Sequence, residues 1–222
     1  MTDRKAIGAV TIGQSPRDDV MRHLKTALGS EVDFFVAGAL DGSSIDEIRS
    51  DGLKASGPLL VTRVRDGKEV RVREGFVTSR LQACVDSLQD RVELMVLLCT
   101  GDIPKLSSTK PVLYPGPLLR NVVGGLGLER LGVLTPAAEQ RDAQLERWSG
   151  HVGWVVVEHA SPYGCRDDLE ASAERLRLAE VDAVAMDCIG YTEEMKRTVS
   201  AKVRRPVLTA TTLLARVIAE LL

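Results

Sequence analysis

The sequence has few of the residues that usually mark a metal centre or a disulfide scaffold. Its 222 residues include three histidines and four cysteines. The cysteines form neither a Cys-x-x-Cys pair nor a zinc-type cluster, and the histidines lie away from every motif described below. We therefore expect no metal and no cofactor. The cysteines are Cys84, Cys99, Cys165 and Cys188, and the histidines are His23, His151 and His159.

The sequence also lacks an excess of charge and a long apolar run. Its 29 Lys and Arg residues against 31 Asp and Glu give a formal charge of −2, which offers no electrostatic reason to expect nucleic acid as a partner. The chain starts with charged residues followed by the short apolar run 6–12. This run is too short to span a bilayer, and no small-residue cleavage site follows it. We expect a cytoplasmic protein with reduced thiols, no membrane contact and a small-molecule substrate.

Short apolar runs alternate with amphipathic segments along nearly the whole chain. This alternation is typical of βα units that form a largely parallel sheet, and it predicts the α/β class. Helical spacing of apolar residues predicts helices in the gaps, and Ser44 with Glu47 predicts a capped helix that Gly52 ends. The strands are expected near 6–12, 32–36, 93–98, 130–134, 153–157, 183–186 and 207–208.

One segment departs from this alternation. Residues 59–73 read LLVTRVRDGKEVRVR, two alternating runs joined around Asp66 and Gly67, which predicts a β-hairpin inserted in the first half of the chain. Val70 and Val72 alternate with arginines, so one face is apolar. We expect that face to cover the core or to contact another subunit, and a homodimer is compatible with the second alternative.

Two strand ends run into a Ser/Thr-Pro turn. Residues 11–18 read TIGQSPRD, in which Ser15 is placed to cap a helix and Pro16 to be its first residue. Thr135 and Pro136 repeat the pattern after a later strand. We expect both turns to start helices and to leave backbone N–H groups available to a ligand.

Two other strand ends run into a Cys-x-Gly turn. Cys99 in VLLCTG and Cys188 in AMDCIG each follow a buried strand and precede a glycine by two positions. The order of turns along the chain therefore repeats, which predicts two related α/β halves, 1–115 and 116–206, with 207–222 packing back on the first. Because ligands bind at the carboxyl ends of parallel strands, we expect an active-site cleft between the halves that contains both cysteines.

Two thiols in one cleft suggest proton transfer. A thiol titrates near ~8.5, and a helix N-terminus or nearby positive dipoles lower its pKa, so one thiolate and one thiol can serve as base and acid on opposite faces of a carbon. Backbone N–H groups of both Cys-x-Gly turns, helped by hydroxyls, could bind the carboxylate and the developing charge. The candidate substrate-binding residues are Thr11, Gln14, Ser15, Arg17, Thr100, Gly101, Thr135, Pro136, Ile189, Gly190 and Tyr191.

Several candidates have a structural alternative. Ser15 and Thr135 are explained by capping alone as well as by capping with ligand contact, and Tyr191 by packing as well as by contact. Arg17 is either a clamp for a second carboxylate or a solvated side chain. Cys84 lies on an apolar helix face and is expected in the core, and Cys165 matches no motif. Asp187, at a strand end, either tunes the neighbouring thiol or satisfies backbone donors.

These motifs together resemble the AroM family, over nearly the whole chain. They are TIGQSPR at 11–17, LLCTG at 97–101, GVLTP at 132–136, SPY at 161–163 and MDCIGYT at 186–192. The family is grouped with the aspartate/glutamate and hydantoin racemase superfamily, which includes maleate isomerase and arylmalonate decarboxylase. The resemblance implies two pseudo-symmetric α/β halves with the active site between them.

The chain differs from typical racemases of that superfamily at both turns. Those enzymes carry Cys-Asn-Thr and Cys-Thr-His-Tyr, whereas this chain has CTG at 99–101 and CIGY at 188–191. Both thiols are kept, and the Asn and His are not. The expected function is a cofactor-independent racemase, epimerase or related isomerase acting on a small carboxylate through Cys99 and Cys188. The alternatives are a single-thiol lyase or decarboxylase, a non-catalytic metabolite-binding or regulatory protein linked to aromatic amino-acid metabolism, and a redox sensor.

Overall fold

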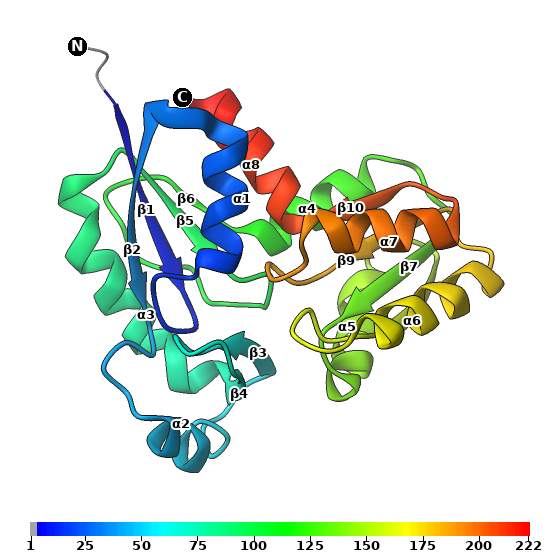
Figure 1. Ribbon diagram of the computed structural model, residues 1–222, viewed down its shortest axis with the longest axis horizontal. Coiled ribbons are helices and arrows are strands. Elements are labelled where there is room, and N and C mark those ends of the chain that lie inside the picture. The colour runs from blue at the N-terminus through cyan, green and yellow to red at the C-terminus, as the bar shows by residue number, and fades with distance from the viewer. Residues whose placement is uncertain (1–3) are drawn as a thin grey trace. The chain divides into compact units, whose positions relative to one another are not determined.

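The computed structural model describes residues 4–222, which divide by their internal contacts into two units. Unit 1 comprises Met1–Pro115 and Leu214–Leu222, and unit 2 comprises Gly116–Leu213. Of the segment 207–222, expected to pack back on the first half, Leu214–Leu222 belong to unit 1, whereas 207–213 belong to unit 2, where Val207–Thr209 pair with its sheet. Figure 1 shows the elements of each unit.

Unit 1 contains a four-stranded parallel sheet in the order β2-β1-β5-β6. The sheet is built from apolar runs, and all five residues of β5 are buried, as expected for a strand covered on both faces. Sequence predicted three of these strands and missed the two-residue edge strand. The strands are β1 (Lys5–Thr11), β2 (Val32–Gly38), β5 (Leu94–Leu98) and β6 (Val112–Leu113).

Unit 2 contains a second four-stranded parallel sheet in the order β10-β9-β7-β8. Each unit places its first strand between its second and third, with the fourth outermost, so the two sheets have the same connectivity. The predicted α/β class with two equivalent halves is confirmed. The strands are β7 (Arg130–Thr135), β8 (Trp154–His159), β9 (Ala183–Met186) and β10 (Val207–Thr209).

Helices flank both sheets, and local capping explains several of their ends. Ser44 accepts a hydrogen bond from Glu47 N at 3.2 Å and Gly52 ends the helix, as the sequence predicted. Thr192 caps another helix by accepting from Met195 N at 3.3 Å. The helices are α1 (Asp18–Leu28), α2 (Ile45–Asp51), α3 (Glu74–Leu88), α4 (Pro115–Gly124), α5 (Arg141–Ser149), α6 (Arg166–Leu178), α7 (Glu193–Val203) and α8 (Ala210–Leu221).

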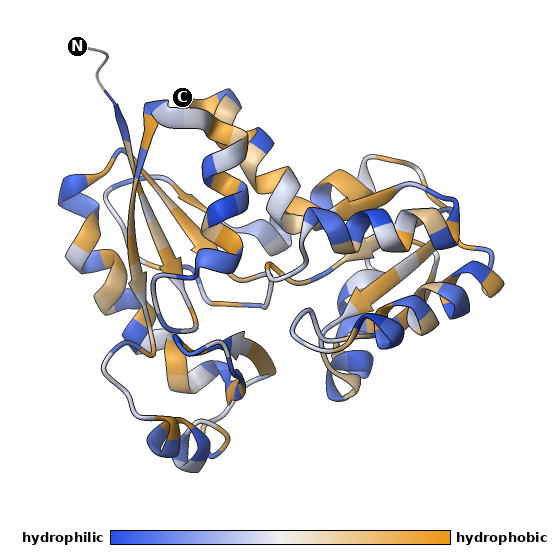
Figure 2. Cartoon of the chain, viewed as in Figure 1, coloured by the Kyte–Doolittle hydropathy of each residue, from blue (hydrophilic) through white to orange (hydrophobic). Residues whose placement is uncertain are grey.

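Each unit has its own hydrophobic core. In unit 1 one core cluster joins α3 to the sheet and the hairpin, and Cys99 belongs to it. In unit 2 a cluster joins α6 and α7 to the sheet, and Cys188 belongs to it. Figure 2 shows largely hydrophobic strands and hydrophilic outer turns on the helices. Among residues 4–222 no helix combines the length and the apolar character that crossing a bilayer requires.

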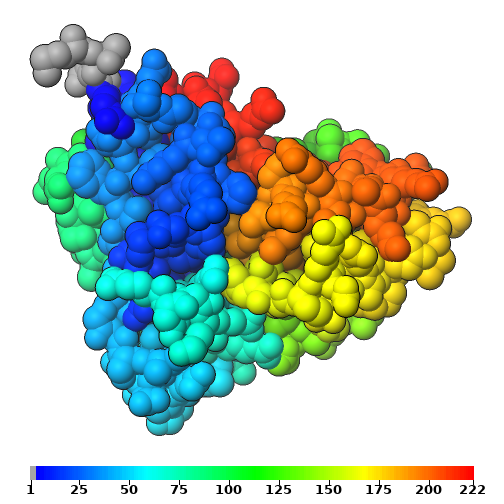
Figure 3. Space-filling model, in the orientation of Figure 1, coloured from blue at the N-terminus to red at the C-terminus, as the bar shows by residue number. Residues whose placement is uncertain are grey.

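The predicted hairpin is present in unit 1 as β3 (Leu59–Arg63) and β4 (Glu69–Arg73), paired antiparallel. Val70 and Val72 are buried in the unit 1 core while Arg71 and Arg73 are exposed. The apolar face therefore covers the core of its own unit, which is the first of the two expected alternatives. In the space-filling view the cyan hairpin forms part of the surface of unit 1 (Figure 3).

Candidate functional site

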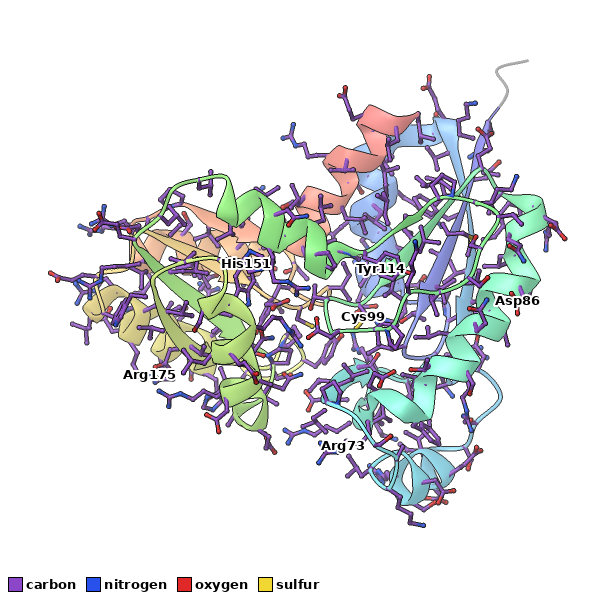
Figure 4. The ribbon with its side chains drawn as sticks, turned by 180° about the vertical axis from the view of Figure 1, so that it is seen from behind. Arg73, Asp86, Cys99, Tyr114, His151 and Arg175 are labelled. Atoms are coloured by element: carbon purple, nitrogen blue, oxygen red, sulfur yellow. The ribbon has the colours of Figure 1, made fainter. Side chains whose placement is uncertain are left out.

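The Cys99 turn follows β5 at the carboxyl end of the unit 1 sheet. Cys99 is buried, and its Sγ accepts a hydrogen bond from the N–H of Gly101 at 3.3 Å. Thr100, between them, is also buried. Figure 4 shows Cys99 beyond the end of the sheet, on the side where the hairpin lies. The Gly101 N–H is therefore directed at the Cys99 sulfur.

The Cys188 turn has the same geometry in unit 2. It follows β9, and the Sγ of Cys188 accepts from the N–H of Gly190 at 3.4 Å. Ile189, between them, is buried, and its carbonyl accepts from Thr211 Oγ1 at 2.7 Å. The repeat found in the sequence is therefore a repeat of structure: in each unit a glycine two residues on donates to the cysteine sulfur.

Both glycines are required by a segment that packs directly on the turn. A Cβ at Gly101 would lie 2.5 Å from Leu60 Cδ2 of the hairpin and 3.3 Å from Cys99 Sγ. A Cβ at Gly190 would lie 2.6 Å from the Tyr163 hydroxyl and 3.0 Å from Pro162. The hairpin thus covers the first cysteine turn with hydrocarbon, and the 161–163 SPY motif covers the second with a phenol.

The first Ser/Thr-Pro turn differs from its prediction. Ser15–Pro16 is a cis peptide, helix α1 begins at Asp18, and its N-cap is Arg17 in the left-handed region with φ 54°. Ser15 is therefore not a helix cap and Pro16 is not a first helical residue. The backbone of Ser15 is held by residues distant in sequence: its N–H donates to Asp41 Oδ1 at 2.8 Å and its carbonyl accepts from Arg65 Nε at 2.9 Å.

The N–H groups of this turn are already used within unit 1, contrary to the expectation that they are available. Gly13 N donates to Thr11 Oγ1 at 3.1 Å, and Gln14 N donates to Arg63 O at 3.1 Å. The Gln14 side chain donates to the carbonyls of Leu40 and Ser43 and accepts from the N–H of Arg65 at distances of 2.9–3.0 Å. Gln14 therefore connects the turn to the hairpin and to the loop that precedes α2.

Arg17 is buried rather than solvated. Its Nε and Nη2 donate to the two carboxylate oxygens of Asp19 at 2.9 and 2.8 Å, and its Nη1 donates to Thr11 Oγ1 at 3.1 Å. Burial opposes ionisation of Asp19, but the hydrogen bonds and charge of Arg17, with the charge of Arg63, lower the pKa of that carboxyl below its usual value. The guanidinium is thus engaged by a protein carboxylate, an outcome that neither sequence alternative included.

The second Ser/Thr-Pro turn also differs from its prediction. Thr135 ends β7 and Pro136 is buried beyond it, but α5 starts only at Arg141, after the 3-10 turn Ala138–Gln140. The Thr135 hydroxyl donates to Gln140 Oε1 at 3.0 Å and accepts from Gln144 Nε2 at 3.4 Å. It is therefore a member of a side-chain network and not a helix cap.

A buried carboxylate beside Cys188 completes this network. Asp187 Oδ2 accepts from Trp148 Nε1 at 3.0 Å and lies 3.8 Å from Arg147 Nη1. Trp148 Nε1 also lies 3.1 Å from Gln144 Oε1. We call Thr135, Gln140, Gln144, Arg147, Trp148 and Asp187 the Trp148 network. It joins the second cysteine turn to α5 through Asp187, the residue before Cys188.

The remaining candidates have structural partners or lie elsewhere. The Tyr191 hydroxyl is buried and donates to Ala160 O at 2.7 Å. Cys84 packs against the unit 1 core, and burial, followed by the charge of Asp41, raises the pKa of its thiol to about 11. Cys165 is exposed at the start of α6. Within residues 4–222 no cluster of three or more His, Cys, Asp or Glu side chains is placed to hold a metal ion.

Sequence reasoning missed the residues that reach the turns from distant segments. These are Leu60 and Thr62 of the hairpin, Asp19, and the Gln144, Arg147 and Trp148 members of the Trp148 network. The buried apolar helix positions and the SPY motif were visible in the sequence, but their partners were not. A lone tryptophan in the mostly polar helix α5 was the available signal.

Solved structures of known proteins share this fold. Allantoin racemase from Klebsiella pneumoniae matches with a TM-score of 0.65 at 13% identity, covering 98% of this chain and 87% of that one. The maleate cis-trans isomerase of Nocardia farcinica matches with a TM-score of 0.64 at 17% identity, covering 97% and 91%. Arylmalonate decarboxylase matches with a TM-score of 0.60 at 14% identity, covering 96% and 92%. The fold is that of the Asp/Glu racemase-like proteins, which include cofactor-independent racemases and isomerases.

The sequence comparison is more specific than the fold. Residues 7–222 match the family of AroM proteins, so the chain belongs to the AroM family. No curated protein matches the chain in sequence.

Proposed function

We propose that this protein is a cofactor-independent racemase, epimerase or related isomerase, in which Cys99 and Cys188 exchange protons with a small carboxylate-bearing substrate. The observation that carries the proposal is the repeated turn: in each unit a cysteine sulfur at the carboxyl end of a parallel sheet accepts a hydrogen bond from the glycine N–H two residues on. Neither of the other two cysteines has this setting.

The proposed reaction balances without a redox partner. One thiolate removes the proton from the carbon next to the carboxylate, so that a C–H bond breaks, an S–H bond forms and the electron pair moves onto the carboxylate oxygens. The other thiol returns a proton to the opposite face and becomes the thiolate. Gly101 N–H and Gly190 N–H stabilise whichever sulfur carries the charge, which allows either direction.

A single-thiol lyase or decarboxylase is the second candidate. It is supported by the fold match to arylmalonate decarboxylase and by the unequal covers of the two turns, Leu60 over one and Tyr163 over the other. In that reaction a C–C bond breaks, carbon dioxide leaves and one thiol protonates the resulting carbanion, so the second cysteine has no chemical role.

Proton NMR in deuterated water tests both candidates at once. The panel follows the names of proteins that share the fold: allantoin, maleate, both enantiomers of aspartate, and phenylmalonate as a simple arylmalonate. We expect exchange or isomerisation that disappears in both Cys99→Ser and Cys188→Ser, with Cys84→Ser and Cys165→Ser as matched controls. Turnover that survives in either of the first two variants would reject the two-thiol mechanism, and decarboxylation that needs only one would establish the second candidate.

A further inference from the structure

One face of strand β3 meets the two turns that follow β1 and β5 in unit 1. Because side chains alternate along a strand, Leu60 and Thr62 point to the same side. Leu60 lies against Gly101 of the Cys99 turn, and a Cβ at Gly13 would lie 2.5 Å from Thr62 Oγ1. The hairpin therefore brings one hydrocarbon and one hydroxyl to the carboxyl end of the unit 1 sheet.

The hydroxyl of Thr62 has no structural explanation. The residue is 1% exposed, and within residues 4–222 its Oγ1 has no hydrogen-bond partner. Burying a hydroxyl that makes no hydrogen bond is unfavourable, whereas valine has the same shape, no polar group to desolvate and a high preference for strands. Packing alone would therefore favour valine at this position.

The neighbouring hydroxyl of Thr11 has a defined polarity. Thr11 is the register partner of Leu98, the residue before Cys99. Its Oγ1 accepts from Gly13 N and from Arg17 Nη1, both at 3.1 Å, so both lone pairs are occupied. Towards a ligand this hydroxyl can only donate. Two threonine hydroxyls thus flank Gly13, one next to its N–H and one over its Cα.

We propose that Thr62 binds the substrate at the Cys99 site and that, together with Thr11, it donates hydrogen bonds to a carboxylate oxygen. This inference rests on the proposed function and deepens it, because it names the group that orients the substrate on the Cys99 side. It also gives Arg17 a role: its guanidinium is paired with Asp19 and fills one acceptor site of Thr11. The carboxylate is held by neutral donors.

Alkylation chemistry tests the inference without a known substrate. Iodoacetate carries a carboxylate one bond from its reacting carbon, and iodoacetamide replaces that carboxylate with a neutral amide. Each reagent forms an S–C bond with loss of iodide. We would measure the rate of each reagent at Cys99 by peptide mass spectrometry and use exposed Cys165 in the same molecule as the reference for intrinsic reactivity. The variants are Thr62→Val and, as the conservative control, Thr62→Ser.

In the native protein the iodoacetate-to-iodoacetamide rate ratio is expected to be higher at Cys99 than at Cys165. Thr62→Val should lower the Cys99 ratio roughly tenfold, as expected for a lost hydrogen bond to a charged group, while leaving the Cys188 ratio unchanged. Thr62→Ser should keep the ratio within about twofold. Thr62→Val should unfold at the same temperature as the native protein or higher, because no protein hydrogen bond is lost.

Three results would overturn the inference. One is a Cys99 ratio that changes by less than about threefold in Thr62→Val. The second is a clear fall in the unfolding temperature of that variant, which would mean that the hydroxyl stabilises the protein itself. In either case an intact Cys99-dependent exchange would leave the proposed function standing. The third is a Cys99 that neither reagent reaches in the folded protein, which would reject both.

Discussion

Arg17 separates a structural reading of the first turn from a substrate-clamp reading. Its guanidinium makes two hydrogen bonds to Asp19 and one to Thr11, and its side chain is only 2% exposed, against 16% for Asp19. Arg17→Met removes the charge and keeps the length of the side chain. It leaves the mostly buried Asp19 carboxylate without its partner, and breaking a buried pair from one side typically costs about 3–5 kcal/mol.

Urea denaturation at pH 7 measures this loss as a free energy of unfolding. In thermal unfolding, a chain of this length should lose roughly 2–4 °C of unfolding temperature per kcal/mol. Asp19→Asn should also destabilise, because it removes the carboxylate charge that faces the buried Arg17 guanidinium. The double variant should recover part of the loss, so that the cycle shows a coupling energy of more than about 1 kcal/mol. The exposed pair of Lys54 with Asp51 offers a control, since Lys54→Met should change stability by well under that amount.

The pH dependence adds a second test with a fixed sign. The folded-state pKa of Asp19 is lowered, so its contribution is fully present above the ordinary carboxyl pKa and is lost as pH falls through the lowered value. Without Arg17 the pKa of Asp19 should rise from this lowered value, because burial still opposes ionisation while the hydrogen bonds and charge of Arg17 are gone, so acid should destabilise the variant less than it destabilises the native protein. The stability gap between the native protein and Arg17→Met should therefore shrink from pH 7 towards pH 4. A gap below about 1 kcal/mol at pH 7, or one that widens in acid, would refute the structural reading.

Two further predictions concern unit 2. Trp148→Phe should destabilise the protein by about 2–3 kcal/mol, because the buried Asp187 carboxylate loses its 3.0 Å donor. Trp154→Phe is the control at an exposed position and should cost far less in the same urea titration. Gly190→Ala should lower the unfolding temperature and slow Cys188 alkylation, because the new Cβ lies 2.6 Å from the Tyr163 hydroxyl. Gly150→Ala is the control and should be nearly neutral, because its new Cβ meets no atom within 4 Å. Equal effects in the two glycine variants would contradict the close packing on the Cys188 turn.

The parts of the fold that sequence predicted are those whose signals are local. Buried parallel strands appear as short apolar runs, and seven of them were found near their observed positions. The hairpin was found because a Gly-containing turn joins two alternating runs. The strand β6 was missed because two residues, Val112 and Leu113, carry no periodicity. The Cys-x-Gly turns were found by repetition within one sequence.

The parts that sequence missed are set by partners far along the chain. Ser15 and Pro16 have the composition of a helix start, but Asp41 and Arg65 hold that turn in another conformation from 26 and 50 positions away. Arg17 looks solvated until Asp19 is placed beside it. No local pattern contains these contacts, and this is why the residues of the turn were identified while the roles of their polar groups were not.

The two cysteine turns share a backbone device and differ in what covers it. The N–H to sulfur hydrogen bond is made within a three-residue turn and is present in both units. The covers come from unrelated segments, Leu60 of an inserted hairpin and Tyr163 of a loop after β8, and they present hydrocarbon and phenol respectively. The two thiols therefore share a backbone hydrogen bond and have chemically different surroundings. Exchanging the covers, with Leu60→Tyr or Tyr163→Leu, should therefore alter substrate preference more than it alters the ability of either cysteine to react.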